Sequence, residues 1–174
     1  MELCEGVGVP RYVFHTFHYQ RDFWRVQTIK QIGSLERQKI LNSNEWEEVK
    51  RQGDAAIQRW IDGQMQGKSC DIVLIGSQTA GRKWINYEIL KAWHDGKGVL
   101  GVYIHNLKDQ SGFTSPRGVN PFSSLTVKAN GQTISLDKLV PVYDPGYSSG
   151  TAYAEIAENL ESWVEDAIKL RKHW

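Results

Sequence analysis

Residues 70–75, Cys-Asp-Ile-Val-Leu-Ile, form a nearly continuous aliphatic run in the middle of the chain. A strand with one face in water alternates polar and apolar residues, so a run without that alternation is typical of a strand buried on both faces of a parallel sheet. The segment 76–81 then turns into a helix that carries Ile85, Ile89 and Trp93 on one face. Residues 99–104 form a second buried run. Strands that alternate with helices predict a parallel sheet with helices on both faces and right-handed crossovers.

The residues before this unit extend the pattern. Residues 12–17 are β-prone, and residues 21–32 have helical spacing. A longer helical pattern runs from Trp46 to Met65, and Gly53 is placed to divide it in two. No strand is evident between residues 31 and 53, which are polar and helix-prone.

The C-terminal third is predicted to add further elements to the sheet. Residues 105–122 form a polar loop, long enough to be functional or mobile and equally explained as a surface insertion. Asn130-Gly131 between two short β-prone runs predicts a hairpin. Residues 139–143 are expected to form an edge strand because Pro141 cannot donate to a ladder, and residues 151–172 an amphipathic helix. The expected fold is α/β, a flavodoxin-like three-layer sandwich with a mainly parallel sheet and a C-terminal hairpin and helix.

Composition limits the classes of function. The 174 residues suit one domain, 1–174, with a core at about 11–106 and additions at about 107–172. A net charge of +1 gives no basic field for nucleic acid. Neither a signal peptide nor a span of about 20 apolar residues is evident, and Cys4 and Cys70 do not suggest a disulfide framework. We therefore expect a cytoplasmic protein without nucleic-acid or membrane partners.

Ligands of open α/β sheets bind at the carboxyl ends of the strands, so the loops that follow the predicted strands are the informative ones. They carry Phe17-His18-Tyr19-Gln20, residues 76–79 with Ser77, and His105-Asn106. Aromatic rings, hydroxyls and imidazoles at one edge would suit a nucleotide. His15 and His18 are poorly spaced for a metal on a strand, and no metal site is predicted.

The helix after residue 81 holds the sharpest candidate. Trp84 and Glu88 are four residues apart and so share one helix face, which is expected to point toward this edge. Glu88 borders an apolar stripe, and partial burial would raise its pKa. By spacing alone, Glu88 is better explained as the partner of Lys91 in an ordinary ion pair than as a catalytic group.

The segment from Ser77 through Trp84 to Glu88-Ile89, after a buried strand, resembles the third strand and helix of TIR domains. Residues 13–17 are similar to the TIR opening strand, and residues 17–20 and 75–79 are closer still to the TIR-like component of the bacterial Thoeris antiphage system. The resemblance covers residues 11 to about 106 and continues weakly through 118–122. The loop that follows the second strand of TIR domains has no recognisable counterpart in residues 31–53.

The resemblance implies an enzyme that cleaves the nicotinamide-ribose bond of NAD, with Glu88 catalytic. NAD is the substrate and no cofactor is expected. The product would be a cyclic ADP-ribose-type signal that activates a separate effector, and the enzyme would form a homo-oligomer on activation. The residues expected to bind the substrate are Phe17, His18, Tyr19, Ser77 and Trp84.

Two alternatives remain from other classes. One is a non-catalytic TIR scaffold that acts by self-association, because a fold does not imply a function. The other is a receiver-like regulator, which needs a cluster of acidic residues directly after the first strand, and this chain offers only Asp22 there. Five further tryptophans lie on helical apolar stripes and are expected to pack in the core: Trp24, Trp46, Trp60, Trp93 and Trp163.

Overall fold

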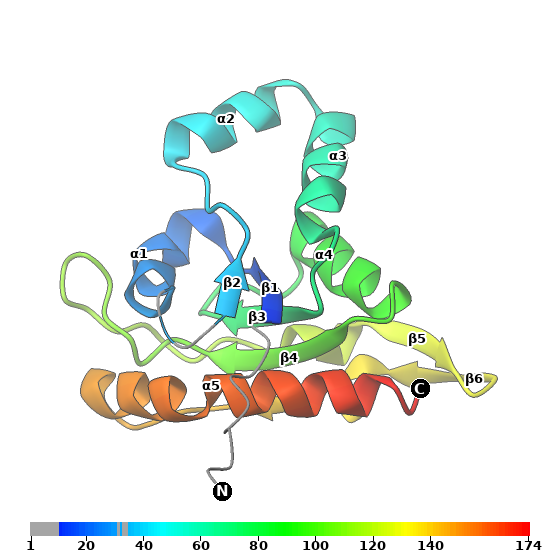
Figure 1. Ribbon diagram of the computed structural model, residues 1–174. Helices are drawn as coiled ribbons and strands as arrows, with labels where there is room; N and C mark the ends of the chain where they lie inside the picture. The colour runs from blue at the N-terminus through cyan, green and yellow to red at the C-terminus, as the bar shows by residue number, and fades with distance from the viewer. Residues whose placement is uncertain (1–10, 31, 33–34) are drawn as a thin grey trace, which may run out of the picture.

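The computed structural model describes residues 11–30, 32 and 35–174. Its centre is a five-stranded parallel sheet in the order β2-β1-β3-β4-β7 (Figure 1). The strands are β1 Arg11–Thr16, β2 Leu35–Arg37, β3 Cys70–Ile75, β4 Gly98–Tyr103 and β7 Val142–Tyr143. This is the flavodoxin-like order, and it confirms the fold class predicted from the buried runs.

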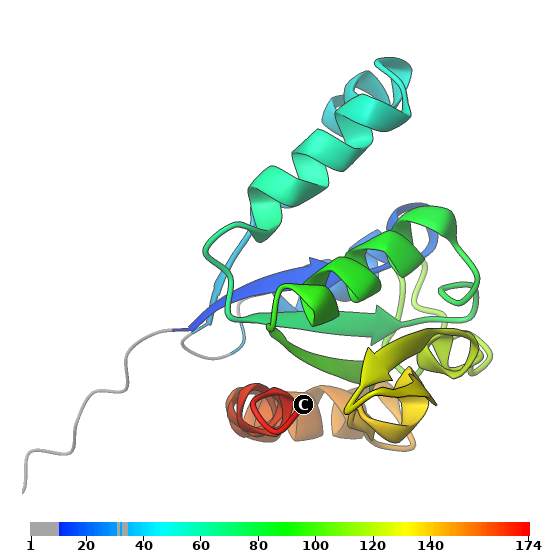
Figure 2. The ribbon, with the colours of Figure 1, turned by 90° about the vertical axis from the view of Figure 1, so that its right-hand side faces the viewer.

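Helices cover both faces of the sheet. Helices α1 (Tyr19–Ile29) and α5 (Ser149–Arg171) pack on one face, and α3 (Asp54–Met65) and α4 (Lys83–His94) on the other. A hydrophobic core lies on each face of the sheet, and successive residues of β3 point into the two cores alternately. Ile72 and Leu74 face α1 and α5, while Val73 and Ile75 face α3 and α4. Figure 2 shows α5 and α4 on opposite sides of the strands.

Strand β2 corrects the expectation that residues 31–53 contain no strand. It has three residues, and Leu35 is the one that is buried. A pattern of three residues is too short to show a period, and the strand forms because β1 offers it a ladder, with Arg11 opposite Leu35 and Val13 opposite Arg37. Its existence therefore depends on a neighbour in space rather than on its own sequence.

Helices α2 (Ser43–Arg51) and α3 form an arm that rises away from the sheet toward α2 in Figure 2, while Ile61 and Met65 of α3 pack into the core with Val73 and Ile89. Gly53 separates them with a φ of +92°, which L side chains rarely adopt, and this confirms the predicted break. Asn42 and Glu45 form a capping box at the start of α2. No residue of α2 is buried, so α2 is fixed mainly by its caps and its contacts with α3.

The C-terminal additions follow the predicted plan. Strands β5 (Thr126–Ala129) and β6 (Gln132–Ser135) are antiparallel, and both turn residues, Asn130 and Gly131, have positive φ as a type I′ turn requires. Val127 and Ala129 pack into the core beside α4. Two short 3-10 helices, Pro121–Ser124 and Leu136–Lys138, flank the hairpin.

The five tryptophans that were expected in the core divide into three groups. Trp93 and Trp163 are buried in the two cores as expected. Trp46 and Trp60 are only partly buried and contact each other on the arm. Trp24 is 51% exposed, so its assignment to the core was wrong, because the buried side of α1 is occupied by Asp22, Arg25, Val26 and Ile29. No helix in the described ranges is long and apolar enough to cross a membrane.

Candidate active site

A cleft lies at the carboxyl end of β1, between α1, the arm and α4. It has an inner pocket with a cavity volume of about 60 Å³ and an adjoining outer pocket of about 260 Å³. Phe17, Tyr19, Trp46 and Glu88 line both. Together they are about as large as the smallest small-molecule sites of proteins, roughly 300 Å³.

The predicted site residues are brought together with one exception. Phe17, His18, Tyr19, Trp84 and Glu88 all line the outer pocket. Ser77 instead lines a polar pocket with Arg21, Trp24 and residues of the 109–116 segment. The connection from β3 to α4 runs over seven residues before the helix begins at Lys83, and this carries Ser77 away from Glu88.

Glu88 is half-buried on the side of α4 that faces the sheet. Burial and the nearby Asp71 carboxylate raise the pKa of Glu88 well above its usual range, and a hydrogen bond with the Thr16 hydroxyl opposes part of the shift. Lys91 pairs with Asp95 at 3.0 Å and with Asp62 at 3.8 Å rather than with Glu88. The simple ion pair considered from the spacing is therefore not the role of Glu88.

Asp71 and Thr16 lie beneath Glu88 and were not singled out from the sequence. The Thr16 hydroxyl is 2.9 Å and 3.1 Å from the two carboxylate oxygens of Asp71. Asp71 is wholly buried, and this burial raises its pKa to about 7. The one available signal was an acidic residue inside an otherwise aliphatic strand.

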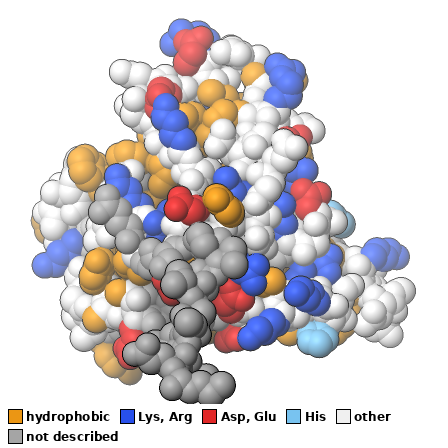
Figure 3. Space-filling view, viewed as in Figure 1, with side chains coloured by type: hydrophobic (Ala, Val, Ile, Leu, Met, Phe, Trp, Pro, Cys, Tyr) orange, Lys and Arg blue, Asp and Glu red, His pale blue; other side chains and the backbone are white. Residues whose placement is uncertain are grey.

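Aromatic rings form the walls of the cleft. Phe17 and Tyr19 have ring centroids 6.0 Å apart, Tyr19 and Trp46 6.2 Å, and Trp46 and Trp60 5.7 Å. The Tyr19 hydroxyl donates to the Leu41 carbonyl, which holds the chain after β2 against α1. Figure 3 shows hydrophobic side chains gathered at α2 and between α2 and α1. Residues 38–41 and the arm thus complete the site, although no TIR-like loop could be recognised in that part of the sequence.

The outer rim is cationic. Lys50, Arg82 and Lys83 line it, and Arg82 stands at the N-cap of α4, which has no side-chain cap. Lys83 pairs with Asp54 and lies 4.8 Å from the centroid of the Trp84 ring. The positive end of the α4 dipole and these side chains favour an anionic group at this end of the cleft.

His15 and His18 make different contacts. His18 caps α1, where its Nδ1 accepts from the Arg21 N–H at 3.3 Å. His15 is buried, its Nε2 accepts from Arg37 at 3.3 Å, and burial lowers its pKa to about 3. His15 is therefore neutral at ordinary pH.

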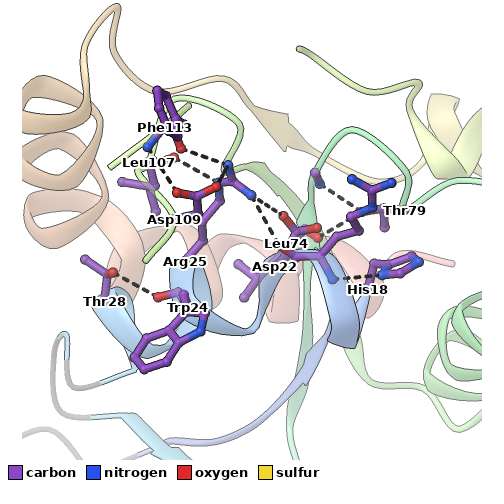
Figure 4. A network of polar contacts seen from close by, with 12 residues as sticks. His18, Asp22, Trp24, Arg25, Thr28, Leu74, Thr79, Leu107, Asp109 and Phe113 are labelled. Atoms are coloured by element: carbon purple, nitrogen blue, oxygen red, sulfur yellow. Dashed lines mark hydrogen bonds and ion pairs between the residues drawn. The ribbon is translucent and has the colours of Figure 1, made fainter. Parts of the chain in front are cut away.

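A second polar network supports the other side of α1 (Figure 4). Arg25 is 4% exposed; it pairs with Asp22 at 3.1 Å and donates to the carbonyls of Leu107 at 2.9 Å and Phe113 at 3.1 Å. Asp109 accepts from the Phe113 N–H. The first part of the 105–122 loop is thus fastened to α1.

A carboxyl group between an aromatic pocket and a rim that carries Lys50, Arg82 and Lys83 lies at the carboxyl edge of this flavodoxin-like sheet. These features define an α/β protein with a cleft at the edge where open α/β sheets bind their ligands. Residues 14–109 match the family described as "Thoeris protein ThsB, TIR-like domain", and the chain belongs to this family.

A relative from Bacillus cereus (strain MSX-D12), named "Putative cyclic ADP-D-ribose synthase ThsB1", is 37% identical over 119 residues. The aligned region is 65% of this chain and 62% of the relative, so the chain spans less than two thirds of the relative's length.

Proposed function

We propose that the protein cleaves the nicotinamide-ribose bond of NAD, with Glu88 as the catalytic residue. The observation that carries the proposal is the position of Glu88, which lines both the inner aromatic pocket and the outer cationic one. A ligand that fills both pockets has to pass this carboxylate. NAD matches the cleft because it combines two aromatic bases with a diphosphate.

The chemistry suits one carboxylate. Cleavage of the bond passes through an oxocarbenium-like state, and a carboxylate that accepts hydrogen bonds from the ribose hydroxyls stabilises the positive charge, as in glycosidases. Nicotinamide leaves as a neutral base and needs no proton. Phe17, Tyr19 and Trp84 offer faces on which a base can stack, and Lys50, Arg82 and Lys83 offer charges for the diphosphate.

The product we propose is a cyclic ADP-ribose-type signal that activates a separate effector in antiphage defence. Support comes from the family and from the relative, whose name describes a cyclic ADP-D-ribose synthase. The aromatic walls favour this outcome, because a site that excludes water lets a nucleophile of NAD itself attack the ribose. We also propose that the enzyme forms a homo-oligomer when it is activated.

The direct test is nicotinamide release from NAD by the purified protein, with and without lysate of phage-infected cells, followed by mass spectrometry of the products. Glu88→Gln should lower turnover at least about 100-fold, as expected for the loss of a group that stabilises transition-state charge. Glu158→Gln, at an exposed position on α5, is the matched control and should retain wild-type turnover.

Unchanged turnover in Glu88→Gln would remove Glu88 from the mechanism. Oligomers that signal in cells without NAD turnover would instead support the alternative function, a non-catalytic scaffold that acts by self-association.

A further inference from the structure

Asp71 is a buried acid in an otherwise apolar strand. It lies in β3, where every residue is buried, and no ion pair joins it to a cation in the described part of the chain. Lys97 acts on it through space, but the Lys97 ammonium donates to the Lys68 carbonyl at 2.8 Å. Burying a carboxylate without a cationic partner is costly, and an aliphatic residue would serve a buried strand better.

Thr16 connects this acid to Glu88. Its hydroxyl is within hydrogen-bonding distance of both Asp71 oxygens and is also hydrogen-bonded to Glu88. A hydroxyl has one proton, so it can donate to only one of the two carboxyl groups. All three groups are satisfied when the other carboxyl group carries a proton of its own and donates it to the Thr16 oxygen.

If Glu88 and Asp71 were both ionised, the two carboxylates on either side of Thr16 would repel each other. The stable arrangement of the pair is therefore one proton and one negative charge, distributed over Glu88, Thr16 and Asp71. The charge can reside at either end of this chain of hydrogen bonds.

We propose that Asp71 is a positioning residue of the active site that acts on Glu88 through Thr16 and accepts the Glu88 proton when NAD binds. The inference rests on the proposed function, because it requires that Glu88 face the ribose in its ionised form. The cationic nicotinamide ring favours negative charge on the nearer carboxylate, Glu88. The Glu88 proton passes to the Thr16 oxygen as the Thr16 proton passes to Asp71, so no proton is exchanged with water.

After nicotinamide has left as a neutral molecule, the attacking nucleophile releases its proton to solvent, and the proton on Asp71 returns to Glu88 by the same path. The charge of the pair is the same before, during and after the reaction. Asp71 thus lets the half-buried Glu88 stay neutral in the free protein, where a second negative charge beside Asp71 would be costly, and become ionised when the substrate arrives.

Other titratable groups surround the cleft. His15 and Lys39 line its inner pocket, and His18, Lys50, Arg82 and Lys83 its outer pocket. His15 is neutral, because burial lowers its pKa to about 3, and Lys39, Lys50 and Lys83 pair with Glu45, Glu47 and Asp54. Among the described residues, Thr16 is the side chain that is hydrogen-bonded to both carboxyl groups.

The experiment is the pH dependence of nicotinamide release in wild type, Asp71→Asn, Thr16→Val and Thr16→Ser. Asp71→Asn removes the charge that keeps Glu88 protonated. The fall in the rate on the acid side of the pH profile should therefore shift to lower pH by about one pH unit or more. Thr16→Ser keeps the hydroxyl and should retain the wild-type profile. Thr16→Val should lower the maximal rate about tenfold or more, since proton relay by a positioned side chain typically contributes a factor of roughly 100 or more.

Asp137→Asn, at an exposed position, is the control for loss of an acidic charge and should leave the profile unchanged. An active Asp71→Asn protein whose rate falls on the acid side at the same pH as in wild type would overturn the proposal, and so would a Thr16→Val protein that matches Thr16→Ser. If Asp71→Asn does not fold, the two Thr16 variants decide the question. Activity that survives Glu88→Gln would remove Glu88 from the mechanism and would overturn the proposal as well. A wild-type protein that releases no nicotinamide from NAD would refute the proposed function instead.

Urea unfolding at several pH values tests the pair without any turnover, using Glu88→Gln, Asp71→Asn and the double variant. If the carboxyl groups share a proton, the effect of Asp71→Asn on the pH dependence of stability should differ between the wild-type and the Glu88→Gln backgrounds. Equal effects in the two backgrounds would show that the groups titrate independently, and the proposal would be wrong.

Discussion

The side chain of Gln38 pairs with the backbone of His15 as a neighbouring strand would. Its Oε1 accepts from the His15 N–H at 2.9 Å, and its Nε2 donates to the His15 carbonyl at 2.9 Å. This pair continues the ladder after β2 ends at Arg37 and leads into residues 39–41 of the inner pocket. One amide group therefore joins the edge of the sheet to the site.

Gln38→Ala should destabilise the protein by about 1–3 kcal/mol, because it leaves a buried N–H and a buried carbonyl of His15 without partners. Urea unfolding measures this change. Gln132→Ala, at an exposed position on β6, should stay within about 0.5 kcal/mol of wild type. Equal stability of the two variants would mean that the Gln38 pair does not hold the sheet edge.

Trp46→Ala should weaken the binding of NAD while leaving most of the stability, because Trp46 is partly exposed on the arm. Loss of one stacking ring should raise the KM for NAD about tenfold, which corresponds to about 1.4 kcal/mol. Trp24→Ala is a matched control, since Trp24 is exposed on α1 and lies outside the Glu88 cleft. Equal KM values for the two variants would exclude Trp46 from the binding site.

Arg25→Met should lower the free energy of unfolding by about 3–5 kcal/mol, because it leaves the buried Asp22 carboxylate without its cationic partner. Asp22→Asn combined with Arg25→Met should recover part of this loss, and Arg59→Met, at an exposed position on α3, should be nearly neutral. Denaturant unfolding measures the stability, and amide hydrogen exchange should be faster in residues 107–113. A loss below about 1 kcal/mol would show that Arg25 does not anchor the loop.

His15 should make the protein sensitive to acid. Its pKa is about 3 in the folded protein and about 6.5 in the unfolded chain, so the unfolded chain binds the proton first as the pH falls. The stability that His15 contributes is full above pH 6.5 and is lost as the pH falls toward 3, by about 2 kcal/mol between pH 7 and pH 5.

His15→Gln should remove this part of the pH dependence, measured as the difference in unfolding free energy between pH 7 and pH 5. His173→Gln, at an exposed position, should keep the wild-type slope. A wild-type slope in His15→Gln would mean that His15 does not titrate between these states.

The sequence by itself determined the sheet class, the central strands and the hairpin. The aliphatic runs that became β3 and β4 needed no partner to be recognised, since only strands buried on both faces lack alternation. Asn130-Gly131 fixed its turn because both residues tolerate positive φ. Glu88 and Trp84 were placed together by helical periodicity, and the structure puts both in one pocket.

Tertiary structure alone decided how the site is built. Thr16 and Asp71 are 55 residues apart and meet because β1 and β3 are paired with Phe14 opposite Asp71. Ser77 lies in the same loop region that suggested it, yet the path of the chain before α4 takes it to another pocket. Periodicity records how buried a residue is along its own element, whereas the partner of a buried polar group depends on the register between elements, which no local pattern contains.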